Sequence, residues 1–549
     1  AYGLRMAAPL EIDRISNLDW LGVALYLIGL IGLSFFLSLK QKDRRDYYVA
    51  GKNTGPTAIA ISVLATQCST NSILGAPAFV AFAAGGGLLW LQYELAVPLA
   101  MIFIMFFMMP ILYELRLISV YEYLERRFDL KTRLLLSAVF QLIRVFATAV
   151  TVYSISIVIE LITGLSFLAS VLLLGVFTVV YDVLGGMKAV IYSDVVQMIL
   201  LVSVLFFVLL MLIGEFDGLV QMISSLPSER QTTIDFAGHG LGDGKDFAFW
   251  PMLLGGFFLY VSYYGCDQSQ VQRELSAKNQ DDSQRVLMIN GLLRFPIVLL
   301  YCLVGVGIAV YADSTPSFLP SLPTSGDEPN YNLAVPVFLI QQLPVGIVGL
   351  TLVALFAAAM SSLDSVINSL SAASMEDFLR RFSKSEEWSN DRELLYSRLL
   401  TLFWGVVALS MSFFVGDIAS TVLVAINKVG SLINGPILGV FFLGLLTKRA
   451  VGNGACIGLT LGFLFNLGLW LFAPTVSWLW WNVFGFFVTV VFGYLVSLST
   501  RTWADTAELV WSWRAYEQAR GEQRWGTRYG LLTFWTFVIL VVSYTLSLI

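Results

Sequence analysis

A polar stripe inside one of the most apolar parts of the chain has the chemistry of a cation site. Its members are spaced at i, i+3, i+4 and i+7 and so share one helix face: Ser361, Asp364, Ser365 and Asn368. Alanines at 357–359 let another backbone approach closely. Hydroxyl, carboxylate and carbonyl oxygens are hard ligands that suit a small desolvated cation rather than a soft metal. Such a stripe is also typical of a packing seam between helices, but the aspartate favours cation binding.

A second polar patch interrupts an earlier apolar run, at residues 65–72 (ATQCSTNS). Gly75 and Pro77, which are poor helix formers, follow it closely. A polar interruption beside such residues predicts a locally unwound helix. The carbonyls freed by unwinding can coordinate a cation.

Charged residues inside apolar runs are the third chemical signal. The basic ones are Arg144, Arg294 and Lys428, and the acidic ones are Glu94, Glu160, Asp182, Asp194 and Asp364. A charge at the centre of a spanning helix costs at least about 2.5–3.5 kcal/mol, so each is expected to face a cavity, an ion or a partner charge. Glu160 and Asp182 are expected to lie near helix ends and to reach the membrane surface.

Membrane-spanning helices must position these groups. The 549 residues are 57% hydrophobic and 13% charged, whereas soluble chains carry about 25% charged residues, so most of the surface must face lipid. Fourteen apolar runs are long enough to cross a bilayer as helices, and such lengths exclude barrel strands. They lie at about 18–39, 56–83, 86–112, 134–162, 165–184, 188–214, 247–266, 287–312, 334–375, 394–415, 419–446, 452–473, 477–499 and 530–548.

The distribution of basic residues predicts how the chain is oriented. If the loop at 40–52 is cytoplasmic, alternate loops place 26 of the 33 Lys and Arg inside and 4 outside. This bias predicts a multi-pass protein of the cell membrane with both termini outside. Four tryptophans among charges at 502–528 predict a helix lying in the cytoplasmic interface, and a solvated linker is the alternative.

Several functional classes find little support in the sequence. The single histidine, His239, lies in a polar loop, which argues against Ser-His-Asp chemistry and His-rich metal sites. The four cysteines lie in or beside apolar runs, as buried thiols do: Cys68, Cys266, Cys302 and Cys456. We therefore expect no enzyme activity, no cofactor besides a coupling ion, and no nucleic-acid partner.

Six segments, taken in order, resemble the sodium:solute symporter family. They are 46–52 (DYYVAGK), 121–128 (YEYLERRF), 185–194 (GGMKAVIYSD), 268–273 (QSQVQR), the helix containing Ser361 and Ser362, and 435–439 (GPILG). The resemblance covers nearly the whole chain. It implies the leucine-transporter-type fold, with two inverted five-helix repeats, one helix before them and three after.

The resemblance also divides the chain. An N-terminal part with the extra helix covers 1–55, and the two repeat halves cover 56–214 and 247–446. An extracellular loop at 215–246 separates the halves, and the last helices, with the interfacial segment, cover 447–549.

Sodium sites follow from the resemblance by position. The main site is expected between the first and eighth repeat helices, at the carbonyls of Ala65, Cys68 and Ala358 and the hydroxyls of Ser361 and Ser362. A second site is implied at Asp194, Ser362 and Ser365, to which Asp364 could add a carboxylate. The alternative for Asp194 is a first-turn acid facing the positive end of its own helix.

The solute site implied by the resemblance lies near the membrane midplane. Its expected residues are Gln67, Asn71, Ser72, Glu94, Tyr260, Tyr263, Tyr264 and Asn427. Arg144 resembles the arginine that holds the carboxylate in sialic-acid-transporting members, and 73–78 (ILGAPA) resembles the branch that carries iodide, monocarboxylates and anionic vitamins. Alternatively, Arg144 pairs with Glu94 or another acid and touches no solute.

These features predict a sodium-coupled symporter that imports a small polar solute by alternating access and works as a monomer. A carboxylate-bearing solute such as sialic acid, a sugar acid or a monocarboxylate is favoured. A neutral sugar is the alternative, since Glu94 suits a sugar hydroxyl. A transporter-like solute sensor and a channel are further alternatives, disfavoured by the lack of a signalling domain and of a continuous polar pore face.

Overall fold

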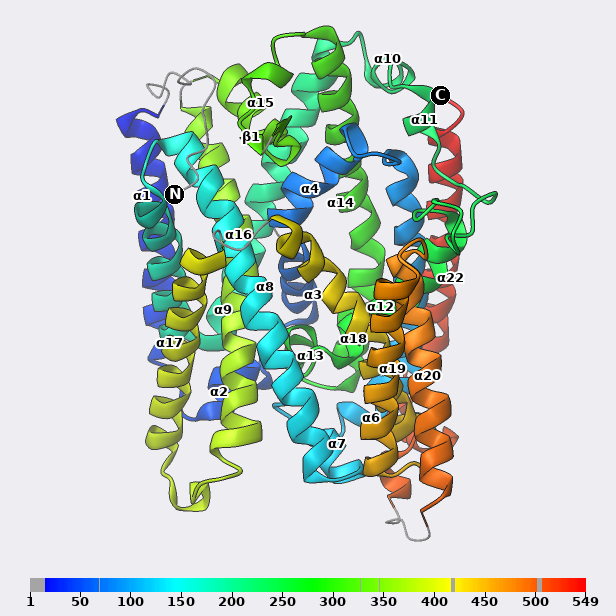
Figure 1. Cartoon of the computed structure of the whole chain (residues 1–549). Helices are drawn as coiled ribbons and strands as arrows, with labels where there is room; N and C mark the ends of the chain where they lie inside the picture. The colour runs from blue at the N-terminus through cyan, green and yellow to red at the C-terminus, as the bar shows by residue number, and fades with distance from the viewer. Residues whose placement is uncertain (1–14, 69, 326, 345, 416–419, 501–505) are drawn as a thin grey trace.

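The structure is a computed structural model that describes residues 15–68, 70–325, 327–344, 346–415, 420–500 and 506–549. Within these residues it is a bundle of upright helices (Figure 1). The strands described, β1 (Thr324–Ser325) and β2 (Glu328–Pro329), form one short antiparallel pair. The predicted all-α class is therefore confirmed.

The helices follow one another along the chain. Up to residue 274 they are α1 (Asn17–Ser38), α2 (Arg44–Val49), α3 (Pro56–Gln67), α4 (Thr70–Ala81), α5 (Ala96–Phe103), α6 (Met109–Leu112), α7 (Glu122–Arg127), α8 (Leu130–Thr163), α9 (Phe167–Glu215), α10 (Leu219–Ser224), α11 (Ser228–Gln231), α12 (Gly256–Cys266) and α13 (Gln268–Glu274). Beyond it they are α14 (Gln280–Ser314), α15 (Ala334–Gln342), α16 (Ile347–Ala373), α17 (Asn390–Val415), α18 (Ser420–Leu446), α19 (Gly452–Phe472), α20 (Trp478–Leu498), α21 (Trp513–Arg520) and α22 (Trp525–Leu546).

The number of long apolar helices is smaller than the fourteen predicted spans. The described residues contain 11 helices long and apolar enough to cross a membrane, or up to 12 if the bent pair α3–α4 is one span. Two predicted runs, 165–184 and 188–214, lie in α9 as two helical stretches that meet at a kink at Gly186, and they count once among the 11. A third, 247–266, consists of a wide helical turn at Pro251–Gly255 followed by the short helix α12.

Gly186 explains how α9 accommodates two predicted runs. Its backbone lies at φ 60° and ψ −151°, which breaks the helical path within α9. A Cβ at this position would lie 2.6 Å from the backbone oxygen of Tyr47. Only glycine combines this φ with so close an approach, so α9 bends where α2 packs against it.

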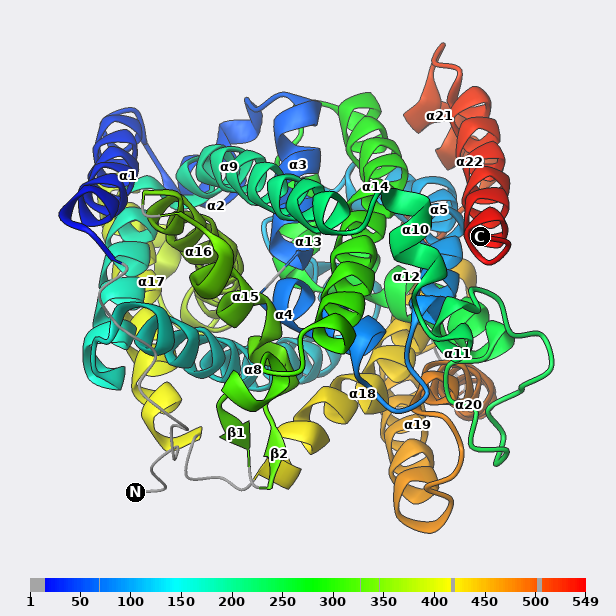
Figure 2. The ribbon, with the colours of Figure 1, turned by 90° about the horizontal axis from the view of Figure 1, so that it is seen from above.

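The helices divide into a central group and a rim. Seen from above, α4 and α13 lie in the middle of the bundle, whereas α1, α17, α19 and α22 lie at its edge (Figure 2). The rim helices expose large apolar side chains, such as Leu25 on α1, Phe414 on α17 and Phe537 on α22. In contrast, most of α16 is buried. A bundle that is apolar outside and carries polar groups inside is the arrangement expected in lipid.

The tryptophan-rich segment after α20 differs from its prediction. Its helix, α21, has eight residues rather than the length of 502–528, and α22 already begins at Trp525. Two of its described tryptophans bind the protein itself, whereas Trp513 is 61% exposed. The indole N–H of Trp511 donates to the backbone oxygen of Phe106 (2.8 Å), and that of Trp525 donates to Asp281 (2.9 Å). The segment is thus docked against the helical turn Ile104–Met108 and against α14, and residues 501–505 lie outside the described part.

Candidate functional site

The predicted interruption at 65–72 is a break between two helices. Helix α3 ends at Gln67, and the pair α3–α4 is bent by 57°. Cys68 follows with φ −75° and ψ 61°, outside the helical range. Its N–H still bonds the carbonyl of Leu64 (2.8 Å), so it closes the last turn of α3. Residue 69 lies outside the described part and α4 begins at Thr70, so the described interruption is the non-helical Cys68 and the bend between the two helices.

Helix α16 lies against this break through its serines. The Ser361 hydroxyl is 3.1 Å from the Ala65 carbonyl oxygen and 3.0 Å from that of Ala358. The Ser362 hydroxyl is 3.4 Å from the same Ala358 oxygen. Four groups expected at the main sodium site are therefore neighbours in space. All four are buried, and they offer neutral oxygens from two helices, which is a hard donor set of the kind a small cation takes.

The residues expected at a second sodium site are joined by an arginine that sequence reasoning missed. The guanidinium of Arg273, on α13, lies 3.8 Å from Asp194 and donates to the Ser365 hydroxyl. It also donates to Ser62 (2.9 Å), whose hydroxyl in turn donates to Asp194 (2.6 Å). The cationic side chain of Arg273 thus lies against the Asp194 and Ser365 oxygens, where a second sodium ion was expected. Sequence reasoning did not single out Arg273 because residues 268–273 follow a predicted span and lie in a predicted loop.

Three carboxyl groups are buried in this part of the bundle, and one of them, Asp194, forms the ion pair with Arg273. Asp182, Asp194 and Asp364 all have no exposed surface. The expectation that Asp182 reaches the membrane surface was therefore wrong: one of its oxygens accepts from Asn368 (3.2 Å), in the interior. The Asp364 carboxylate accepts from the hydroxyl of Tyr181. Glu160, by contrast, is half-buried near the end of α8, as expected.

The acid predicted for the solute site, Glu94, forms an ion pair with Arg294 of α14 (2.9 Å). The same guanidinium donates to the hydroxyls of Tyr260 (2.9 Å) and Tyr264 (3.3 Å), both on α12. Its carbon also lies 4.9 Å from the centre of the Tyr260 ring. Three expected solute residues therefore meet around one arginine. As a charge inside an apolar run, Arg294 could have been singled out from the sequence as their partner.

Arg144 pairs with a different acid, Asp267. Two nitrogens of its guanidinium donate to the same Asp267 oxygen, one of them at 2.8 Å. The face of the guanidinium lies over the Tyr263 ring, 5.4 Å from its centre. Asp267 occupies the junction between α12 and α13. The sequence left open whether Arg144 binds the solute or pairs with an acid such as Glu94. In the structure Arg144 forms an ion pair, and its partner is Asp267 rather than Glu94.

Two further expected solute residues, Gln67 and Ser72, lie at the α3–α4 break. The Ser72 hydroxyl donates to the backbone oxygen of Gln67 (3.2 Å), and the side-chain oxygen of Gln67 has no hydrogen-bond partner. The side chains of Asn71 and Asn427 lie outside what the structure describes.

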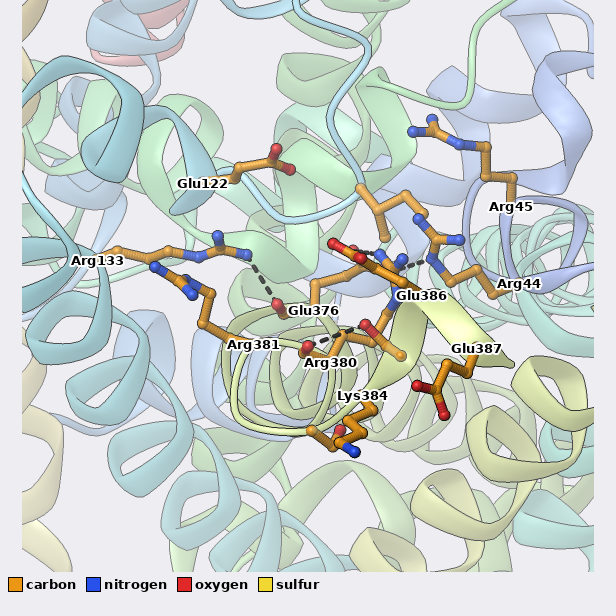
Figure 3. A pocket seen from close by; sticks show the side chains of 13 residues that line it. Arg44, Arg45, Glu122, Arg133, Glu376, Arg380, Arg381, Lys384, Glu386 and Glu387 are labelled. Atoms are coloured by element: carbon orange, nitrogen blue, oxygen red, sulfur yellow. Dashed lines mark hydrogen bonds and ion pairs between the residues drawn. The ribbon is translucent and has the colours of Figure 1, made fainter. Parts of the chain in front are cut away.

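A charged cavity of about 530 Å³ lies elsewhere, at the end of the bundle where α2 and α7 are found (Figures 1 and 3). Ion pairs cross its wall: Arg44 binds Glu376 (2.7 Å) and Glu393 (3.0 Å), and Arg133 binds Asp377 (2.8 Å). None of the predicted sodium or solute residues lines it. The ion pairs connect α2 and α8 to the ends of α16 and α17, so we assign the cavity a structural role.

Known proteins share both the sequence and the fold. A sodium/sialic acid symporter of Aliivibrio fischeri is 28% identical over 500 residues, which cover 89% of this chain and 94% of the relative. A sodium-coupled monocarboxylate transporter of Xenopus laevis is 27% identical over 481 residues, covering 86% and 75%. The solved structure of a substrate-bound, outward-open Na⁺-coupled sialic acid symporter superposes with a TM-score of 0.79 at 23% identity, covering 89% of this chain and 99% of that one.

The family assignment is made on the profile of the sodium:solute symporter family, which matches residues 47–462. This range contains the α3–α4 break, the serines of α16 and both arginine–carboxylate pairs. It also contains five of the six segments that carry the resemblance in the sequence, and all of the other one except its first residue, Asp46. The chain therefore belongs to the sodium:solute symporter family, a family of membrane transporters.

Proposed function

We propose that this protein imports a small carboxylate-bearing solute together with sodium by alternating access. The observation that carries the proposal is the approach of Ser361, on α16, to the Ala65 carbonyl beside the α3–α4 break. Carbonyls freed at a broken helix and hydroxyls of a neighbouring helix are oxygen ligands that transporters use for sodium. With the Cys68 carbonyl and Ser362, they form the proposed main sodium site.

Coupling follows if sodium and solute favour the same conformation. Sodium bound from outside holds α3 against α16 and thereby shapes the neighbouring solute site. Solute binding then permits closure. Inside the cell, low sodium releases the ion, the contact between the two helices loosens, and the solute follows.

The arginines beside the expected solute residues support an anionic solute. A guanidinium pairs with a carboxylate through two parallel hydrogen bonds. The Arg144 side chain is 25% exposed and the Arg294 side chain 11%, so Arg144 is the more accessible of the two. We assign the solute carboxylate to Arg144. The names of the two relatives, which carry sialic acid and monocarboxylates, point to the same class of solute.

A neutral sugar is the second candidate, and one observation favours it. One Glu94 carboxylate oxygen is buried without a hydrogen-bond partner, although the other binds Arg294. An unsatisfied buried oxygen is a ready acceptor for a sugar hydroxyl. Asn71, Asn427 and the tyrosines around Arg294 would then complete a polar site.

A second sodium ion is proposed at Asp194, Ser362, Asp364 and Ser365. The buried carboxyl groups of Asp182, Asp194 and Asp364 support it, because a bound cation would offset the charge of those that ionise beyond the one that Arg273 pairs with. Binding there requires Arg273 to move away from Ser365.

We further propose that both termini face the outside of the cell. The bias of basic residues supports this orientation. In the bundle, α1 begins and α22 ends at the same end as α10 and α15 (Figure 1). The two repeat halves, 56–214 and 247–446, and a monomeric working unit are part of the same proposal.

Uptake into proteoliposomes under an inward sodium gradient tests the proposal. Sialic acid, lactate and pantothenate supply carboxylates, galactose supplies a neutral sugar, and proline a zwitterion. Potassium replaces sodium as the control. Sodium-dependent accumulation of a carboxylate is expected. Accumulation of galactose alone would move the assignment to the neutral sugar, and no sodium-dependent accumulation together with no sodium-dependent thermal stabilisation would refute the mechanism.

A further inference from the structure

The junction between α12 and α13 is held by a single acidic residue. Asp267 leaves the helical path at φ −90° and ψ 121°, and its carboxylate bonds in two directions. One oxygen accepts from the backbone N–H (2.9 Å) and the hydroxyl of Ser269, inside its own turn. The other oxygen accepts only from Arg144 of α8. The ion pair therefore joins α13 to a helix that is distant in sequence.

This division of bonds bears on how the ion pair could be exchanged. If Asp267 left Arg144, one of its oxygens would keep both bonds to Ser269. The Asp267 side chain is mostly buried, at 11% exposed, and that of Arg144 is 25% exposed. A solute carboxylate at Arg144 would keep the guanidinium paired, so the cost of breaking the ion pair falls on the second oxygen of Asp267.

The rest of α13 is held by other bonds. Arg273 has no exposed surface and binds Ser62, Ser365 and the backbone oxygen of Ser269. In the first turn, which is equally buried, Gln268 binds the backbone of Ile118 and Val120. The Asp267–Arg144 pair is therefore one of several ties of α13, and it is the one made to α8.

We infer that Asp267 is a built-in competitor for the solute carboxylate at Arg144, and that its displacement removes the tie between the start of α13 and α8. The inference rests on the proposed function, since it takes Arg144 as the group that binds the solute carboxylate. It adds a residue that sets the affinity and the class of solute without contacting it.

Competition rather than joint binding follows from charge. Two carboxylates on one guanidinium leave a net negative charge in a partly buried place, where repulsion is weakly screened. The ring of Tyr263 covers one face of the guanidinium, and its hydroxyl is held by Gln270 of α13 (2.7 Å). A solute that takes over Arg144 therefore disturbs a second contact to the same turn.

The test uses Asp267→Asn in the full-length protein. Asparagine keeps the shape and an oxygen for Ser269 but carries no charge. Equilibrium binding of sialic acid, lactate and pantothenate is measured in sodium, and affinity for whichever carboxylate the wild type binds is expected to rise roughly tenfold. Asp267→Glu should restore the charge and return the affinity toward that of the wild type. Glu160→Gln, an acid-to-amide change on α8 outside the site, should have no effect.

A second readout needs no solute. Hydrogen exchange of the backbone at 267–275 should be faster in Asp267→Asn and in Arg144→Gln, and no faster in the double variant than in either single one. Unchanged or weaker carboxylate binding by Asp267→Asn, with normal binding by the wild type, would overturn the inference and leave the proposed function intact. A wild type that binds none of the three carboxylates would overturn both.

Discussion

Two helix breaks lie in the middle of this bundle, and they differ in the charge that lines them. The α3–α4 break, after Cys68, meets neutral hydroxyls of α16. The α12–α13 break, at Asp267, meets the guanidinium of Arg144. Both interrupt a helix inside the bundle, where irregular backbone is tolerated because protein rather than lipid surrounds it.

The different side chains at the two breaks indicate that each break suits a ligand of different charge. Carbonyl and hydroxyl oxygens attract a cation and have little use for an anion. A guanidinium attracts an anion, and the carboxylate of Asp267 already occupies that position. We therefore assign sodium to the first break and the solute carboxylate to the second, and α16 and α13 connect them, since Ser365 binds Arg273.

The largest expected effect comes from removing the hydroxyls at the first break. The double variant Ser361→Ala/Ser362→Ala should abolish sodium-stimulated uptake, because two ligand oxygens of the proposed main site disappear. Uptake with and without sodium measures it. Ser154→Ala on α8, whose hydroxyl only bonds back to Val150 (3.0 Å), is the control and should behave as the wild type. Normal sodium stimulation in the double variant would place sodium elsewhere.

At the second break, Arg144→Gln should weaken binding of a carboxylate solute by roughly 10- to 100-fold, the range expected for losing charge-assisted hydrogen bonds. Sodium-dependent thermal stabilisation should persist, because the α3–α16 contact is untouched. Solute affinity and melting temperature, measured side by side, separate the two breaks. Unaltered affinity for the carboxylate would make the Arg144–Asp267 pair purely structural.

A smaller effect is expected from Tyr263→Phe. The ring stays over Arg144, but the bond from Gln270 to the hydroxyl (2.7 Å) is lost. One such bond contributes about 1 kcal/mol, so carboxylate affinity should change by roughly fivefold. Tyr26→Phe, which also removes a buried hydroxyl but lies on α1, should leave it unchanged. A change of 100-fold in Tyr263→Phe would mean that this hydroxyl binds the solute directly.

The smallest effect is expected from Cys68→Ala. The proposed ligand is the backbone carbonyl of Cys68 rather than its thiol, so sodium affinity should stay within about twofold of the wild type. Sodium titration of thermal stability measures it. A loss as large as in the serine double variant would show that the thiol or its packing controls the first break.

Local sequence rules predicted the parts of the site that depend on one helix. The interruption at 65–72 follows from polar residues before Gly75 and Pro77, and the break is found there. The stripe with Ser361 and Asp364 follows from the helical period, and its members are buried together. Asp182 was placed wrongly, because a predicted break between two apolar runs does not reveal whether that break lies at the membrane surface or, as at Gly186, inside the bundle.

The sequence by itself determined the membrane class, the helical content, the polar face of α16 and the family, because hydrophobicity, helical periodicity and sequence motifs are properties of short segments. Only the tertiary structure decided which acid each arginine meets. Glu94 is 200 residues from Arg294, and Asp267 is 123 residues from Arg144. A buried charge is stable only when it is paired with an opposite charge. Which opposite charge is available depends on which helices are neighbours in the folded protein.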